Sequence, residues 1–370
     1  MNTRTSPKAT AVRAVAATLA ALAAIGLCLL TQDNVSADIK AKRVERLNAR
    51  IANVYTADYQ QMAEENLVKA RDKQARTIDD IYVQDNPYGT NTTSMYVYFT
   101  TDYATKIKYT VSADGYPDFT RAVAQDEEYQ KEHEFLVLGL IPDVENTITF
   151  TITDDNGLDI TQTITHDGPS LLGVEEVQLE RTVTADDGAD LGDGLYAILG
   201  NDSDEQDFMY YYDTNGVLRG EIPVKYYRSH RLLFDDDGLM WFSASTHTMV
   251  GMNRLGKLEK IYDLDSRFIL HHDYALDANG DIVLLATDLE RGDHAVQDQV
   301  VKLDTSTGET TLLLDFGDLF DAYKQSTDHS GIDESDPTAT NRWDWLHCNT
   351  IQLLDDGSAL FSAVLKIGRA

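Results

Sequence analysis

The sequence contains very little cysteine. Only Cys28 and Cys348 occur in 370 residues, and Cys28 lies in an uncharged N-terminal run. No internal disulfide framework or cysteine-based metal site can therefore hold the fold together. The chain also lacks any His-Glu-x-x-His motif, which removes the commonest helical zinc site.

Basic residues are scarce as well. Lys and Arg number 31 against 62 Asp and Glu, so the formal net charge is −31. Such a chain repels the phosphates of nucleic acid, and the acidity suits a soluble protein outside the cytoplasm. At this length we expect more than one domain, each with ample core.

Residues 1–37 have the pattern of a targeting segment. A basic lead that includes Arg4 and Arg13 precedes residues 14–32, which carry no charge. Val35-Ser36-Ala37 offers small residues to a signal peptidase, but the apolar run is also long enough to remain as a membrane anchor. Both outcomes stay open. Both predict an exported protein, periplasmic or at the cell surface, that meets the membrane only through this segment.

Residues 38–78 are rich in Ala, Lys, Glu, Arg and Gln, with Leu47, Ile51 and Val54 among the apolar residues at helical spacing. This periodicity predicts an amphipathic helix or a pair of helices. The segment is either a brace on the following domain or a solvated spacer, and the sequence leaves both open.

Residues 79–168 change to the pattern of short strands. Turn signals at Asp114-Gly115 and Pro142-Asp143 separate runs rich in β-branched and aromatic residues. The expected strands include Met95–Phe99, Lys106–Val111, Phe135–Leu140 and Thr147–Thr153. Short strands at this spacing predict a small β-sandwich, similar to a fibronectin-type module. Its His133 and His166 have polar neighbours and are predicted to be surface residues.

Residues 169–370 repeat a hairpin pattern. Asp/Asn-Gly turns, as at Asp235–Gly238 and Asp277–Gly280, recur about every 40 residues between strand-like runs. Two hairpins at this period are typical of a four-stranded propeller blade. The fold class expected is therefore mainly β: an N-terminal helical segment, a small sandwich and an incomplete propeller of about four of six blades.

The blades can be placed from these turns. We expect a leading blade, two fuller blades over residues 229–264 and 271–315, and a fragment from residue 347 onward. The stretch 317–344 interrupts the pattern and is rich in Asp, Ser and Thr. Such an insertion is expected over the mouth of the propeller, where functional loops gather.

Histidines recur at the start of three blades. They occur in Ser229-His230-Arg231, His271-His272-Asp273 and His347-Cys348-Asn349. The innermost strands of a propeller line its channel, so His230, His272 and His347 are predicted to face one axis. A channel-wall role for each is the alternative.

A histidine cluster permits two kinds of chemistry. Neutral imidazoles bind zinc, copper or nickel, or they perform acid–base and nucleophilic work on an anionic group. The lack of cysteine ligands and of a histidine–glutamate motif favours the second, so no metal is expected. The acidic turn Asp235-Asp236-Asp237 is explained by turn chemistry without calcium.

Two stretches resemble the bacterial arylsulfate sulfotransferases. One runs from His271 to Asp281, and the other from Asp344 to Ser358 with its Trp-Leu-His-x-Asn element. The resemblance covers about residues 80–362. It implies transfer of a sulfuryl group from an aryl sulfate donor to a phenolic acceptor through a transiently sulfated histidine, with no cofactor.

The resemblance also implies the site residues. His347 and one of His271 or His272 would hold and protonate the sulfate and phenolic oxygens, and Asn349 would support them. The family carries an arginine on the strand after the His-x-Asn element, where this chain has Phe361–Leu365, and its nucleophilic histidine lies about two blades further on. The resemblance therefore implies a truncated member that lacks its nucleophile and is impaired.

The alternative function is a non-catalytic extracytoplasmic propeller that only recognises a ligand. The expected partners are the donor and the acceptor, without nucleic acid. A homodimer stays open.

Overall fold

The computed structural model describes residues 40–123, 129–180, 192, 194–200, 207–226, 228–264, 267–333, 335 and 341–364. The predicted targeting segment lies outside these ranges. The chain divides into two compact units between Arg50 and Ile51. Within the described ranges, no helix is long and apolar enough to cross a membrane.

Two consecutive helices occupy the segment predicted to be helical. Residues 40–54 are helical, and α2 spans Ala57–Arg71. Thr56 separates them because its hydroxyl accepts a hydrogen bond from a first-turn amide and so caps α2. Tyr55 is buried, and the Gln60 side chain accepts a hydrogen bond from a backbone amide of a later sheet. These contacts are those of a brace.

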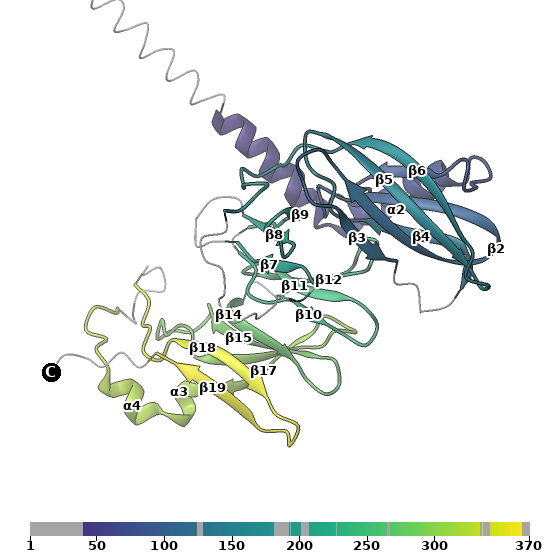
Figure 1. Cartoon of the computed structure of the whole chain (residues 1–370). Helices are drawn as coiled ribbons and strands as arrows, with labels where there is room; N and C mark the ends of the chain where they lie inside the picture. The colour runs from purple at the N-terminus through teal and green to yellow at the C-terminus, as the bar shows by residue number, and fades with distance from the viewer. Residues whose placement is uncertain are drawn as a thin grey trace, which may run out of the picture. The chain divides into compact units, whose positions relative to one another are not determined.

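The next segment forms one six-stranded sheet (Figure 1). Its strands are β1 (Tyr82–Asp85), β2 (Met95–Ser112), β3 (Phe119–Ala122), β4 (Gln130–Val137), β5 (Glu145–Asp154) and β6 (Asp159–Asp167). The long β2 replaces the two separate strands expected from the sequence. Its first half pairs with β4 and its second half with β5, with a register shift between Thr100 and Thr105.

The two halves of this sheet face each other. Phe135 on β4 and Phe150 on β5 lie on strands that do not pair, yet their ring centroids are 6.1 Å apart. Phe99 on β2 contacts both rings, and all three are buried. The sheet thus bends where β2 loses register, and its own two halves enclose the core.

The prediction that His133 lies at the surface is wrong. Its side chain is 1% exposed. The ring packs 5.0 Å from Phe99, and its Nε2 lies 2.9 Å from the Thr105 hydroxyl. β4 places every second residue in the core, and His133 falls on that face beside Phe135. His166 is half-buried and pairs with Asp85 at 2.6 Å.

Four antiparallel sheets follow in chain order (Figure 1). The first contains β7 (Tyr196–Ile198), β8 (Phe208–Tyr212) and β9 (Leu218–Pro223). The second contains β10 (Leu233–Phe234), β11 (Met240–Ser245), β12 (Thr248–Met252) and β13 (Leu258–Asp263). The third contains β14 (Phe268–Leu276), β15 (Ile282–Asp288), β16 (Gln299–Leu303) and β17 (Thr310–Asp315). The last contains β18 (Cys348–Leu353) and β19 (Ala359–Ala363). The described chain is mainly β, as predicted.

The recurring turns have the predicted chemistry. Gly238 and Gly280 have φ of +81° and +82°, a conformation that glycine adopts without strain. The Asp235 carboxylate accepts hydrogen bonds from the Leu239 amide and from Nε1 of Trp241. Asp235 is therefore occupied by its own turn and strand, which accounts for the acidic residue there.

Two short helices begin the predicted insertion. They are α3 (Phe316–Leu319) and α4 (Asp321–Ser326). At the other end of the insertion, the Trp343 amide donates to the His294 carbonyl and the Val296 amide donates to the Trp343 carbonyl. The insertion is thereby joined to the loop between β15 and β16.

Candidate functional site

Bulged backbone places two histidines on neighbouring strands. Between Leu270 and Tyr274, β14 has more residues than its partner β15, and His272 in this bulge has φ of +53°. His347 immediately precedes β18, which has a similar shift at its start, and it also has φ of +53°. Left-handed backbone costs a non-glycine residue about 1–2 kcal/mol. The irregular backbone changes the direction of the His272 and His347 side chains, and the strained φ values are the energetic cost of this change.

The four histidines at the predicted blade starts come together around His272. Its ring centroid lies 4.9 Å from His347, 5.2 Å from His271 and 6.4 Å from His230. Three segments far apart in the sequence thus contribute to one cluster. The rings of His230, His271 and His347 all lie near His272, and His271 had been named as an alternative to His272; that these histidines face one propeller axis stays a prediction.

Burial keeps the central imidazoles neutral. It lowers the pKa of His271 to about 3, and the neighbouring His272 lowers it further. The pKa of His272 is also lowered, first by burial and then by His347. Because the ordinary histidine pKa is about 6.5, both rings carry no charge at neutral pH.

An aspartate holds one ring of the cluster. Nδ1 of His347 lies 2.8 Å from Oδ2 of Asp344, and both side chains are largely shielded from water. A carboxylate there favours the tautomer with the proton on Nδ1, which leaves Nε2 for chemistry. Asp344 was not among the predicted site residues. Its position three residues before His347 was the available signal.

The other predicted residue, Asn349, is half-buried at the β18 bulge. Cys348 between it and His347 is fully buried, and burial raises the pKa of its thiol to about 11. Cys348 is therefore a core residue, whereas His347 and Asn349 are both half-buried.

Several buried polar atoms at this site have no hydrogen-bond partner among the described residues. By strict hydrogen-bond geometry they are Nδ1 and Nε2 of His271, Nε2 of His272 and Oε1 of Gln297; at looser geometry the Gln297 side chain interacts with His272 and the Ala286 backbone with His271. An unsatisfied buried polar atom costs about 1–3 kcal/mol. Such atoms gathered in one place indicate where a polar ligand binds.

A cavity of about 440 Å³ is lined by residues of β14 and β18 and by Arg231, and its lining does not include the four histidines. Its lining includes Asp273 and Thr350, which directly follow His272 and Asn349 on β14 and β18. Arg231 lies on the same wall, with Nη1 3.3 Å from the Asp273 carboxylate. Leu276 and Leu353 contribute apolar surface. The cavity therefore combines an Arg231–Asp273 ion pair with some apolar side chains beside the strands of the histidine cluster.

No group of three or more His, Cys, Asp or Glu in the described part of the chain is arranged to hold a metal ion. The imidazoles around His272 pack ring against ring, and they do not converge on one point. The cluster contains neutral imidazoles, which can accept or donate hydrogen bonds, and one imidazole supported by a carboxylate. Groups of these kinds can catalyse the transfer of a group to or from an oxygen.

The described chain is mainly β, and its histidine cluster is the candidate functional site. The arylsulfotransferase (ASST) family matches residues 180–368, and the arylsulfotransferase Ig-like domain matches residues 82–169. The chain belongs to the arylsulfotransferase family. A comparison with proteins of curated function finds no match.

Proposed function

We propose that this protein transfers a sulfuryl group from a phenolic sulfate ester to another phenol through a sulfohistidine. The observation that carries the proposal is the set of unpartnered, buried imidazole nitrogens around His272 in a chain of this family. A sulfate ester offers a sulfur for one of them to attack and anionic oxygens for the others to bind.

Among the described residues, His272 is best suited to be the nucleophile. It is the central ring of the cluster, its Nε2 has no partner among the described residues, and its lowered pKa keeps a lone pair available at neutral pH. A nucleophilic imidazole must be neutral when it attacks. His271 shares the lowered pKa but is more deeply buried, which suits a supporting role.

His347 is suited to move the proton. In the first step Nε2 of His272 bonds to sulfur, the bond from sulfur to the aryl oxygen breaks, and Nε2 of His347 gives its proton to the departing phenolate. In the second step the acceptor phenol gives that proton back to His347, its oxygen bonds to sulfur, and the N–S bond breaks. The Asp344 carboxylate stabilises the protonated ring of His347 before the first step and again after the second, and it orients the neutral ring between them.

The sheets that carry these residues fit a propeller. We propose that the sheets from β7 to β19 are successive blades and that β14 and β18 are innermost strands. The histidines then lie in the channel, and the cavity beside Arg231 receives the aryl group. Asn349 supplies a further donor to a sulfate oxygen.

The test is covalent trapping. The protein is mixed with 4-nitrophenyl sulfate, quenched in base because N-sulfated imidazole is acid-labile, and digested for mass spectrometry. We expect a sulfuryl group on the peptide that contains His272, turnover with phenol, and loss of both in His272→Ala. His166→Gln, in the N-terminal sheet, is the matched control and should keep both.

The same assay weighs the prediction from the sequence that the nucleophile lies outside this chain. If residues 38–370 turn over donor no faster than a His347→Ala variant and carry no sulfuryl group, His272 is not the nucleophile. Saturable donor binding without turnover would favour the non-catalytic binding module.

We also propose that the protein is exported, on the strength of the basic lead and the uncharged run within residues 1–37. Fractionation of cells that make the full chain checks this. Recovery in the cytoplasm with Met1 intact would contradict it.

A further inference from the structure

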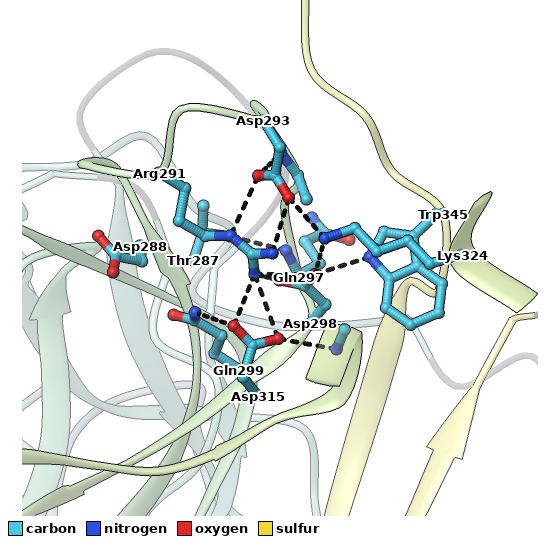
Figure 2. Close-up of polar contacts among 12 residues, drawn as sticks. Thr287, Asp288, Arg291, Asp293, Gln297, Asp298, Gln299, Asp315, Lys324 and Trp345 are labelled. Carbon is cyan, nitrogen blue, oxygen red and sulfur yellow. Dashed lines mark hydrogen bonds and ion pairs between the residues drawn. The ribbon is translucent and has the colours of Figure 1, made fainter. Parts of the chain in front are cut away.

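A buried charge network joins the loop between β15 and β16 to Lys324 and Trp345 (Figure 2). At its centre is Asp298, whose side chain is 0% exposed. Both Asp298 oxygens lie 3.0 Å from Nη1 of Arg291. Oδ2 also accepts a 2.6 Å hydrogen bond from Nε1 of Trp345, two residues before His347. The network thus reaches the candidate site through one indole.

The neighbouring residue holds the other side of His347. The Gln297 carbonyl accepts a hydrogen bond from the Cys348 amide at 3.1 Å. The Gln297 amide in turn donates to the Thr287 hydroxyl at 2.8 Å, which ties the loop to the end of β15. Two consecutive residues of this loop therefore hold the residues at 345 and 348, on either side of the histidine.

A helix of the insertion completes the network. Lys324 on α4 is buried, with Nζ 2.6 Å from Asp293 and 3.9 Å from Asp298. Its ammonium also lies over the ring of Trp345. Burial raises the pKa of Asp298, whereas the cations Arg291 and Lys324 lower it.

A contribution to folding stability alone does not explain such a network. Desolvation of buried charges consumes much of their mutual attraction, and apolar side chains often serve a core as well or better. A buried ionic group is better explained where it fixes one geometry. Here the geometry at stake is the left-handed backbone of His347, at φ of +53°.

We propose that Asp298 is a positioning residue: by holding Trp345 while Gln297 holds Cys348, it keeps the imidazole of His347 against His272. The inference rests on the proposed function, because the distance between the rings of His347 and His272 matters only if both take part in sulfuryl transfer. Asp298 touches neither ring and acts through the backbone of residues 345–348.

The experiment uses two variants that break the link from opposite ends. Asp298→Asn removes the charge that Arg291 orients, and Trp345→Phe removes the indole N–H. Trp343→Phe is the matched control, since that indole is also buried but donates to Thr327. Asp315→Asn is the second control, because its carboxylate also pairs with Arg291 while its other bonds go to Gln299 and Gly317.

We expect Asp298→Asn and Trp345→Phe each to lower kcat about 10–100-fold with KM changed less than about twofold, because reacting groups lose alignment. The double variant should lose no more than the worse single variant, because both changes break one link. Both controls should stay within about twofold of wild type. Multiplicative losses in the double variant, or unchanged kcat in both singles, would overturn the inference.

A second readout does not depend on turnover. The ring nitrogen signals of His347 in ¹⁵N-histidine NMR report its tautomer and its bond to Asp344. We expect these signals to move in Asp298→Asn and Trp345→Phe but not in the controls. If wild type lacks sulfuryl transfer and the signals still move this way, the proposed function fails and the positioning role survives. Unmoved signals remove the positioning role in either case.

Discussion

The buried His133 permits a quantitative prediction about stability. Burial lowers the pKa of its imidazole to about 4, against about 6.5 in an unfolded chain. Between these pH values the unfolded chain binds a proton that the folded protein does not, so stability falls as the pH falls. Each pH unit well inside this window costs up to about 1.4 kcal/mol, so His133 accounts for roughly 2 kcal/mol of the stability lost between pH 7.5 and pH 5.

The perturbation is His133→Phe, which keeps a ring against Phe99 and removes the titrating group. Thr105 loses its bond to Nε2, but its hydroxyl keeps a contact with Thr101 at 3.4 Å. That cost is the same at every pH, so the pH slope isolates the protonation effect.

The assay is urea unfolding of wild type and variant at pH 7.5 and pH 5.0, followed by circular dichroism. The free energy of unfolding of the variant should fall by roughly 2 kcal/mol less than that of wild type across this range. The remaining slope in the variant includes His271, whose pKa is lowered to about 3. Equal slopes in the two proteins would show that His133 is not buried as a neutral ring, and the reasoning would fail.

Three further predictions concern single residues. Asp344→Asn should lower kcat by at least about 10²-fold, because an amide N–H₂ that faces Nδ1 reverses the tautomer of His347. Steady-state kinetics at several pH values check this, and a loss of kcat of less than about threefold would exclude the orienting role. Cys348 should resist iodoacetamide at pH 8 in the folded protein and react in urea, because its thiol pKa is raised to about 11 and it has no exposed surface. Peptide mapping would show this, and rapid labelling of the native protein would contradict the core position of Cys348. Gly238→Ala should lower the free energy of unfolding by about 1 kcal/mol through the positive φ alone. Gly308→Ala should lower it clearly more, because the added Cβ would lie 2.5 Å from the Tyr262 ring. Thermal melts that rank the two variants in the reverse order would refute this.

Local patterns made much of the β architecture predictable. The Asp-Gly turn at Gly238 and the Asn-Gly turn at Gly280 set the period of the later sheets, because a tight turn needs only residues adjacent in the chain. The strands of the second sheet fall within the predicted range 229–264, whereas the third sheet begins at Phe268, three residues before the predicted range 271–315. His133 was missed because one polar residue on a strand face does not reveal what packs over it. The two strands predicted between Met95 and Val111 are one strand, because the bend that separates their partners comes from the facing core.

The histidines at the starts of the predicted blades were visible in the sequence, since a repeat places equivalent residues at equivalent positions. Asp344 was within reach, three residues from His347. Asp298 was not, because its bond to Trp345 joins residues 47 positions apart. The sequence alone determined the turns, the strands and the residue types of the site, since these depend on neighbours along the chain. Only the tertiary structure decided which ring lies at the centre, which imidazoles are neutral and which buried carboxylate holds the segment around His347. Those properties depend on burial and on distances between residues far apart in the chain, and such contacts leave no local pattern.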